Sequence, residues 1–210
     1  IDVAGSGKQL TASASGLSNA VSSAFSVAKA NQAITFGALA SKTYGDAPFT
    51  VSATASSGLP VSFSIVSGPA TIAGNVVTLT GAGTVTVRAA QPGDANWNAA
   101  SNVNQSFAGA PKLLAGSITA NNKTYDGTTS ATIATRTLSG VISSDNVSLT
   151  GGTATFANKN VGSGKTVTAT GLSLSGTAAG NYQLASTSVT TTADITARNL
   201  TASGGTADRQ

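Results

Sequence analysis

Alternation of apolar residues with threonine and serine is the feature that most constrains the fold of this chain. It is clearest in residues 189–196, and it recurs in 49–54, 61–65 and 84–89. A period of two places successive side chains on opposite faces of a strand, as in an antiparallel sheet with one buried face. No stretch keeps apolar residues at helical spacing over three turns. The sequence therefore predicts an all-β protein.

Glycine and proline divide these stretches into short strands. Groups such as Gly58-Leu59-Pro60 and Ser67-Gly68-Pro69 recur at intervals of roughly ten residues, a spacing typical of immunoglobulin-like sandwiches. We therefore expect tandem antiparallel β-sandwich modules of the Ig-like type. A smaller grasp-like sheet is an alternative for the second module. The single tryptophan, Trp97, lies in a late loop and is predicted to close one end of the first core.

A tyrosine-containing motif occurs twice. Lys123-Thr124-Tyr125-Asp126-Gly127 is echoed by Lys42-Thr43-Tyr44-Gly45-Asp46. Such a motif suggests a packed aromatic anchor followed by a turn, in which glycine takes a positive φ and the aspartate accepts hydrogen bonds from nearby backbone N–H groups. These positions are the structural motif residues that we single out: Tyr44, Gly45, Asp46, Tyr125, Asp126 and Gly127.

Internal similarity sets the expected module boundaries. Residues 5–12 resemble 162–169, which fall in the second half of a module, and residues 200–207 resemble 113–120. We predict the C-terminal part of a preceding repeat at 1–30, a first complete module at 31–109, a second at 112–198, and the start of a further repeat at 199–210. In the second module, strands are expected around Ile118, Ile133, Leu138, 147–149, 154–156, 167–174, 182–184 and 189–195.

Two known repeat families resemble these modules. The stretch Lys123 to Thr129, together with Asn181-Tyr182, looks like the YDG-type repeat of large bacterial surface proteins and filamentous-haemagglutinin-like adhesins. Residues 32–49, with Asn96-Trp97-Asn98, resemble the related Tyr-Gly-type (MBG) and bacterial Ig-like repeats. Such families are tandem extracellular modules of stalks and adhesins, and the resemblance brings no catalytic residues with it.

The composition argues against several functional classes. Only 9% of residues are charged, the formal net charge is +4, and the eleven lysines and arginines are scattered singly, so no patch suited to nucleic acid is expected. Neither cysteine nor histidine occurs, which removes thiolate and imidazole chemistry. No apolar run is long enough for membrane insertion. We expect no enzyme activity.

Two possible ligand sites were weighed from the sequence. Gly162-Ser163-Gly164-Lys165-Thr166 carries the end of a phosphate-binding loop, but position 159 is lysine where that motif needs glycine, so a hairpin turn is the preferred interpretation. Calcium is the metal to consider, at Ser144-Asp145-Asn146 with Asp94 or Asp126 brought near by folding. One carboxylate in the local group is few for calcium, and we expect no cofactor.

The leading functional hypothesis is a structural stalk or spacer segment of an extracellular adhesin or matrix protein at the bacterial cell surface, with neighbouring repeats as its partners. One alternative is a self-assembling filament subunit that shares strands between molecules. Another is an adhesin module that binds a glycan or a host protein through loops near Trp97 or Asp145. Tyr44, Tyr125 and Tyr182 could join Trp97 in stacking on sugars, but anchoring a core is the preferred role for these scarce aromatics.

Overall fold

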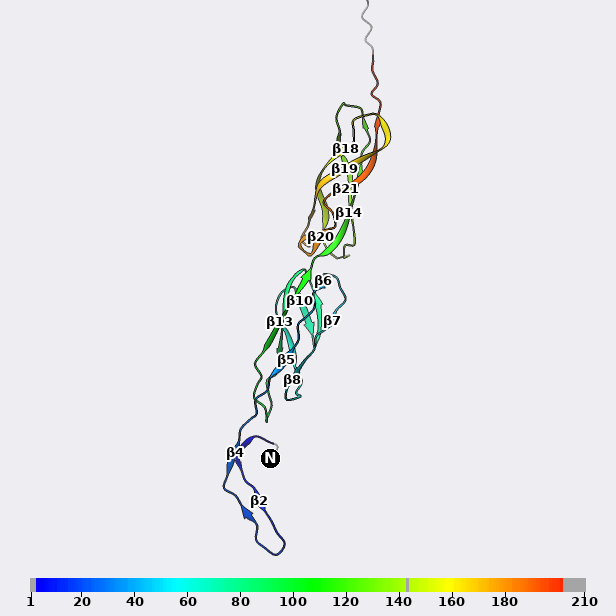
Figure 1. Cartoon of the computed structure of the whole chain (residues 1–210). Coiled ribbons are helices and arrows are strands. Elements are labelled where there is room, and N and C mark those ends of the chain that lie inside the picture. The colour runs from blue at the N-terminus through cyan, green and yellow to red at the C-terminus, as the bar shows by residue number, and fades with distance from the viewer. Residues whose placement is uncertain (1–2, 143, 202–210) are drawn as a thin grey trace, which may run out of the picture. The chain divides into compact units, whose positions relative to one another are not determined.

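The structure, a computed structural model, describes residues 3–142 and 144–201. It is almost entirely β, as the alternation predicted, and it divides into two compact units, Ile1–Ala110 and Pro111–Gln210 (Figure 1). Most of the predicted further repeat at 199–210 lies outside the described residues.

Unit 1 begins with a hairpin. It is built from two short antiparallel ladders: β1 (Gly5–Lys8) with β4 (Phe25–Val27), and β2 (Thr11–Ala12) with β3 (Ala20–Val21). Leu10, which follows β1, leaves 57% of its surface exposed, and Leu17 at the hairpin turn leaves 73%. The last strand of this hairpin is β4, within the segment predicted as the C-terminal part of a preceding repeat.

The remainder of unit 1 contains short strands in several small sheets. They are β5 (Ile34–Phe36), β6 (Lys42–Thr43), β7 (Phe49–Thr50), β8 (Ala53–Ala55), β9 (Ser62–Ser67), β10 (Ala70–Ala73), β11 (Val76–Leu79), β12 (Gly83–Ala90) and β13 (Val103–Ala110). The strand orders are β6-β13-β12-β9, β10-β11-β7 and β5-β8. In the β6-β13-β12-β9 sheet, β6 runs parallel to β13, and the other pairs are antiparallel.

The alternating residues of β12 supply the centre of the unit 1 core. Val85, Val87 and Ala89 are fully buried, as their period-2 pattern predicted. Aromatic side chains from other strands pack around them: the rings of Phe49 and Phe107 meet edge to face at 5.4 Å between centroids. Because edge-to-face contacts add to the burial of apolar area, few large residues are enough to hold this small core.

Unit 2 contains two larger sheets. Its strands are β14 (Lys112–Ala120), β15 (Lys123–Thr124), β16 (Ser130–Ala131), β17 (Ile133–Ser139), β18 (Ser148–Phe156), β19 (Gly162–Ser175), β20 (Tyr182–Leu184) and β21 (Val189–Thr196), with a short 3-10 helix, η1 (Ala179–Asn181), before β20. The sheet orders are β17-β14-β20 and β15-β21-β19-β18-β16. A core that includes Ile118, Phe156, Val167 and Ile195 joins the two sheets.

Two pairs of predicted strands are in fact single strands. Ile133 and Leu138 both lie in β17, and the segments predicted at 147–149 and 154–156 are joined in β18. Gly151 and Gly152, at φ 68° and 83°, have the composition of a turn but lie within β18, whose register with β19 is the same on both sides of them. A side chain at Gly152 would come within 2.8 Å of Leu172, so the close packing of β18 on β19 favours glycine there.

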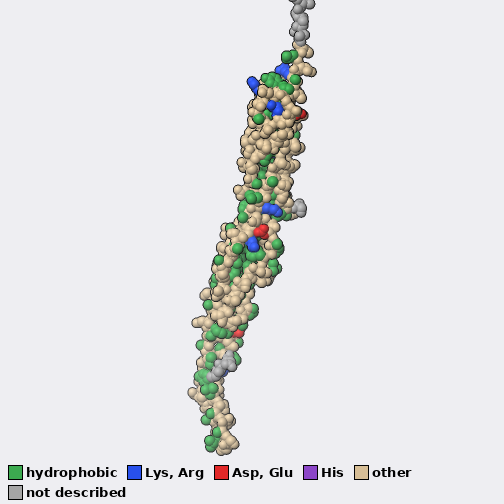
Figure 2. Space-filling model, turned by 45° about the vertical axis from the view of Figure 1, so that its right-hand side comes forward, with side chains coloured by type: hydrophobic (Ala, Val, Ile, Leu, Met, Phe, Trp, Pro, Cys, Tyr) green, Lys and Arg blue, Asp and Glu red, His purple; other side chains and the backbone are tan. Residues whose placement is uncertain are grey.

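The surface carries few charges. Figure 2 shows one face of the molecule on which isolated lysine, arginine and aspartate side chains stand among mostly uncharged groups. On the outer faces, hydroxyl groups pair across neighbouring strands: Ser117 with Thr137 at 2.6 Å, and Thr119 with Thr135 at 2.6 Å. Hydroxyl pairs of this kind stabilise neighbouring strands without charge.

Candidate functional site

The Tyr-Asp-Gly motif of unit 2 links an early strand of the unit to its last strand. Lys123 and Thr124 form β15, which runs parallel to β21. The ladder continues through Tyr125, whose backbone N–H donates to the carbonyl oxygen of Thr196 at 2.9 Å. The Tyr125 side chain packs against the core of the unit. The motif therefore anchors the chain to the last strand before it turns.

Asp126 organises the turn that follows. Its Oδ1 accepts hydrogen bonds from Nζ of Lys123 and from the backbone N–H of Thr128, both at 2.9 Å, and Gly127 takes a φ of 79°. The hydrogen bond from Lys123, followed by those from Thr128, lowers the pKa of Asp126 from 3.8 to about 2. The carboxylate thus stays ionised and serves as a turn acceptor.

The first copy of the motif occupies the matching place in unit 1. Strand β6 runs parallel to the last strand of that unit, β13, and the N–H of Tyr44 donates to the carbonyl oxygen of Ala110 at 2.8 Å. Gly45 takes a φ of 89°, and Oδ2 of Asp46 accepts from the N–H of Thr43 at 2.8 Å. The order of glycine and aspartate differs between the copies, yet both aspartates accept from backbone N–H groups.

The lysine that opens each copy lies against an aromatic ring. Nζ of Lys42 is 5.0 Å from the centroid of the Phe49 ring, and Nζ of Lys123 is 5.5 Å from that of Phe156. Both separations fall within the range of cation–π attraction. The two motifs therefore share a backbone ladder, an aspartate-stabilised turn and a lysine over a phenylalanine.

Tyr182 closes a loop at another part of unit 2. Its ring is 5% exposed, its hydroxyl donates to Oδ2 of Asp145, and the same hydroxyl accepts from the N–H of Ile142 at 3.1 Å. Asp145 was the centre of the calcium hypothesis. The described residues contain no group of three or more acidic side chains that could hold a metal, and the Asp145 carboxylate takes part in closing this loop.

Trp97 does not fill the place predicted for it. It is half-buried and is absent from the side chains that form or contact the described core of unit 1, so the prediction that it closes one end of that core is wrong. Instead, the loop that contains it forms backbone hydrogen bonds with Ala30, which follows the last strand of the hairpin. The N–H of Ala30 donates to the carbonyl oxygen of Asn96, and the N–H of Asn98 donates to that of Ala30, both at 2.8 Å.

Asp94 shapes this Trp97 loop. Its Oδ1 accepts from the N–H groups of Asn96 at 2.8 Å and Trp97 at 2.9 Å, and Oδ1 of Asn96 accepts from the N–H of Ala4 at 2.9 Å. The backbone hydrogen bonds between this loop and Ala30 therefore depend on the exposed Asp94. In this arrangement the loop positions another part of the chain.

A buried glutamine that the sequence analysis missed supports the same loop. Gln91 is 5% exposed; its Oε1 accepts from the N–H of Gly93 and from Nε2 of Gln32, and its Nε2 donates to the carbonyl oxygen of Pro60 at 3.3 Å. A buried amide is tolerated where its donors and acceptors are satisfied. No sequence pattern marks it, because its partners come from three separate segments.

The lysine-containing segment at 162–166 forms the start of β19, so neither the phosphate loop nor the hairpin turn is present there. Gly164 lies in a bulge opposite β21, and its N–H donates to Oδ1 of Asp194 at 2.7 Å. Nζ of Lys165 donates to Oδ1 of Asn158. A phosphate loop needs free N–H groups at the start of a helix, and a strand follows here.

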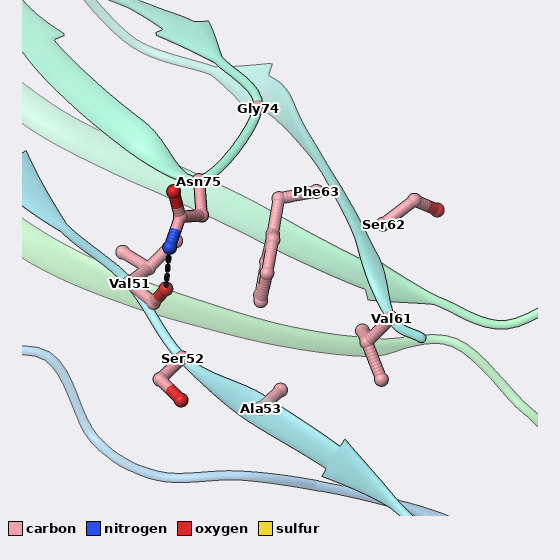
Figure 3. A pocket seen from close by; sticks show the side chains of 8 residues that line it. All are labelled: Val51, Ser52, Ala53, Val61, Ser62, Phe63, Gly74 and Asn75. Atoms are coloured by element: carbon pink, nitrogen blue, oxygen red, sulfur yellow. Dashed lines mark hydrogen bonds between the residues drawn. The ribbon is translucent and has the colours of Figure 1, made fainter. Parts of the chain in front are cut away.

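A shallow cavity of about 510 Å³ lies in unit 1 between β8 and β9 (Figure 3). In Figure 3 the ring of Phe63 stands among the lining residues, with Asn75 on one side and Val61 on the other. Nδ2 of Asn75 donates to the carbonyl oxygen of Val51 at 3.4 Å. The lining contains no charged residue, so these groups supply neither an acid nor a base.

Comparison with known proteins identifies one domain. The YDG domain family matches residues 110–191, a range that contains both the Tyr125-Asp126-Gly127 turn and Tyr182. No curated protein matches the chain. The described residues contain no helix long and apolar enough to cross a membrane. The YDG resemblance of the second module is thus confirmed, and the Tyr-Gly-type or Ig-like identity of the first stays a prediction.

Proposed function

We propose that this chain is a structural segment of a tandem-repeat protein at a bacterial cell surface, where it serves as a stalk or spacer. The YDG domain at 110–191 and the all-β fold support this proposal. The chemistry of the prominent polar side chains agrees with it. Asp46, Asp94, Asp126 and Asp145 all make hydrogen bonds that shape turns or loops.

One observation carries the proposal: each unit joins its tyrosine motif to its own last strand in the same way. The N–H of Tyr44 bonds to Ala110, and the N–H of Tyr125 bonds to Thr196. A repeat architecture requires each unit to complete its own sheet, so the same pairing of tyrosine motif and last strand is expected in every unit. The first unit was predicted to belong to a different repeat type, yet it has the same closure.

The connection between the units fits a spacer. Strand β13 ends at Ala110 and β14 begins at Lys112, so Pro111 alone separates them. Proline fixes its own φ and restricts the residue before it, so this connection has little conformational freedom. We expect such short connections to limit the bending between neighbouring repeats.

Small-angle scattering of the 210-residue chain over a concentration series tests the proposal. A spacer should give a radius of gyration and a maximum dimension that stay constant as the concentration rises. Dimensions that grow with concentration would favour the filament hypothesis instead. A variant with Gly-Gly-Ser-Gly inserted after Pro111 is the matched control: if Pro111 restricts bending, this variant should show a broader distribution of distances.

A further inference from the structure

The β1–β4 ladder of the N-terminal hairpin has the same strand register as the start of the β19–β21 ladder in unit 2. The paired residues are Gly5–Val27 and Lys8–Phe25 in the hairpin, and Gly162–Ile195 and Lys165–Ala193 in unit 2. In both ladders the first strand holds one extra residue between the two pairs. The bulge contains a glycine with a positive φ in each case, 67° at Gly7 and 60° at Gly164. The hairpin β1–β4 therefore reproduces the pairing of β19 with β21.

The two copies differ in how deeply their apolar side chains are buried. Val167 in β19 is fully buried, whereas Leu10, at the matching position after β1, is 57% exposed. Ile195 is 1% exposed, whereas its counterpart Val27 is only half-buried. An exposed leucine and a half-buried valine at positions that are core in the second copy indicate a face that lacks its covering layer.

Unit 2 shows what covers this face. Strand β15 lies along the outer edge of β21, and β18 lies along the outer edge of β19, with Phe156 opposite Val167. In the hairpin, β1 and β4 form a two-stranded sheet, and a hollow of about 440 Å³ is lined by residues that include Gly5, Val27 and Ala28. The strands that cover β19 and β21 in unit 2 have no counterpart here among the described residues.

We propose that the hairpin β1–β4 is an acceptor for the first half of a YDG-type module, that is, for a segment with the strands and side chains of residues 111–157. A Lys-Thr-Tyr strand pairs in parallel with β4, with its lysine opposite Val27 and its tyrosine N–H donating to the carbonyl oxygen of Ala28. A second strand pairs with the segment from Leu10 through β2, as β18 pairs with β19 from Val167 onward, and places an aromatic side chain against Leu10. Addition of strands to open sheet edges is a common mode of recognition. The inference extends the proposed repeat function, on which its biological meaning rests.

The chain order of unit 2 shows how such a half-module can be joined to the hairpin in an experiment. In unit 2, β18 ends at Phe156 and β19 begins at Gly162, so a short turn joins the two halves of the module. By the alignment of residues 5–12 with 162–169, Ile1 corresponds to Asn158. A copy of residues 111–157 placed ahead of Ile1 therefore reproduces the chain order of unit 2.

The test uses the whole chain, extended by a copy of residues 111–157 placed ahead of Ile1. Amide hydrogen exchange is measured for residues 5–12 and 20–27 in the extended and the original chains. We expect exchange in these segments to slow by roughly a hundredfold in the extended chain, since sub-global opening then replaces local fraying. The matched control carries Tyr125→Ala and Phe156→Ser in the added copy alone, and we expect it to lose this protection.

Two results would overturn the inference. One is unchanged exchange at residues 5–27 in the extended chain, whether or not the added residues become protected. The other is protection of the hairpin in the original chain that rises with protein concentration, which would make a second copy of the chain the occupant. Scattering of the original chain is independent of this exchange experiment, so failure of the spacer proposal and failure of the acceptor proposal can be told apart.

Discussion

The hydroxyl of Tyr182 donates a hydrogen bond to Oδ2 of Asp145, a residue 37 positions earlier in the chain. Two separate loops of unit 2 are thereby closed on one another, because Asp145 also donates its N–H to the carbonyl oxygen of Ile142 at 2.9 Å. Tyr182, which the sequence analysis singled out as part of the YDG resemblance, thus holds in place the segment on which the calcium hypothesis was centred.

Replacing Tyr182 by phenylalanine should destabilise unit 2 by about 1–2 kcal/mol, because Asp145 and the N–H of Ile142 both lose a buried partner. Hydrogen exchange of residues 140–147 should accelerate at the same time. Tyr182→Ala, which also removes the buried ring, should cost about 3–5 kcal/mol. Denaturant unfolding followed by circular dichroism measures both variants. Equal stability of wild type and Tyr182→Phe would contradict a structural role for the hydroxyl.

The turn at Asp126 should make unit 2 sensitive to acid. Because the pKa of Asp126 is lowered from 3.8 to about 2 in the folded state, the ionised carboxylate stabilises the fold above pH 3.8, and this contribution is lost as the pH falls toward 2. The difference in unfolding free energy between wild type and Asp126→Asn should therefore shrink from pH 5 to pH 2.

The variant Lys123→Met is the partner control for that experiment. The hydrogen bond from Lys123 is the largest cause of the lowered pKa, so its removal should reduce the pH dependence attributed to Asp126, and the bonds from Thr128 should retain part of it. The side chain of Asp126 is 51% exposed, so added salt should weaken the effect in wild type. If the difference in unfolding free energy between wild type and Asp126→Asn grew on acidification, the lowered pKa of Asp126 would be contradicted.

Gly93 should tolerate no side chain. It has a φ of 80°, and a Cβ there would lie 2.8 Å from the carbonyl carbon of Asn98 and close to the carbonyl oxygen of Trp97. Gly58 is a matched control, since it has a φ of 77° and nothing within 4 Å of the same position. Gly58→Ala should cost about 1 kcal/mol for its backbone conformation. Gly93→Ala should cost about 1–3 kcal/mol more for the collision.

Fluorescence of Trp97 provides the measurement for both glycine variants, because it is the single tryptophan and it lies in unit 1. Unfolding in guanidinium chloride should shift further for Gly93→Ala than for Gly58→Ala. Identical midpoints would show that the 94–98 loop moves aside at no cost.

Removing the carboxylate of Asp94 should loosen the hold on the hairpin strand. Asp94→Ala leaves the N–H groups of Asn96 and Trp97 without their acceptor, so the backbone bonds to Ala30 should open more often. We expect faster hydrogen exchange at residues 28–31 and a change in Trp97 emission, with residues 112–196 unaffected. Asp46→Ala, which removes a turn acceptor elsewhere in unit 1, should leave exchange at 28–31 unchanged.

The sequence predicted the strands better than their ends. Alternation located β12 and β21, because each buries one face and exposes the other. It divided β18 in two, since Gly151-Gly152 has the composition of a turn, and only the partner strand β19 shows that the ladder continues past the two glycines. Local composition indicates where a chain can bend, and whether it turns back depends on what packs beside it.

The roles of single residues were predicted correctly where their partners are local and missed where their partners are distant in sequence. Asp46 and Asp126 act as turn acceptors, as predicted, because their partners lie within three residues of them. Trp97 was assigned to the core on size alone, and Gln91 was overlooked, because the groups that they meet come from distant segments. Sequence patterns describe local hydrogen bonding well and carry little information on contacts between distant segments.

The parallel pairing of β15 with β21 determines how unit 2 responds when its two ends are pulled apart. One strand follows closely on the start of the unit and the other is its last, so tension along the chain slides them past each other and loads their hydrogen bonds in shear. Bonds loaded together must break together, whereas a hairpin pulled open at one end loses them one at a time. Strand β6 against β13 gives unit 1 the same geometry. If the chain carries tension, we expect the force at which a unit unfolds to depend on the few hydrogen bonds of this ladder.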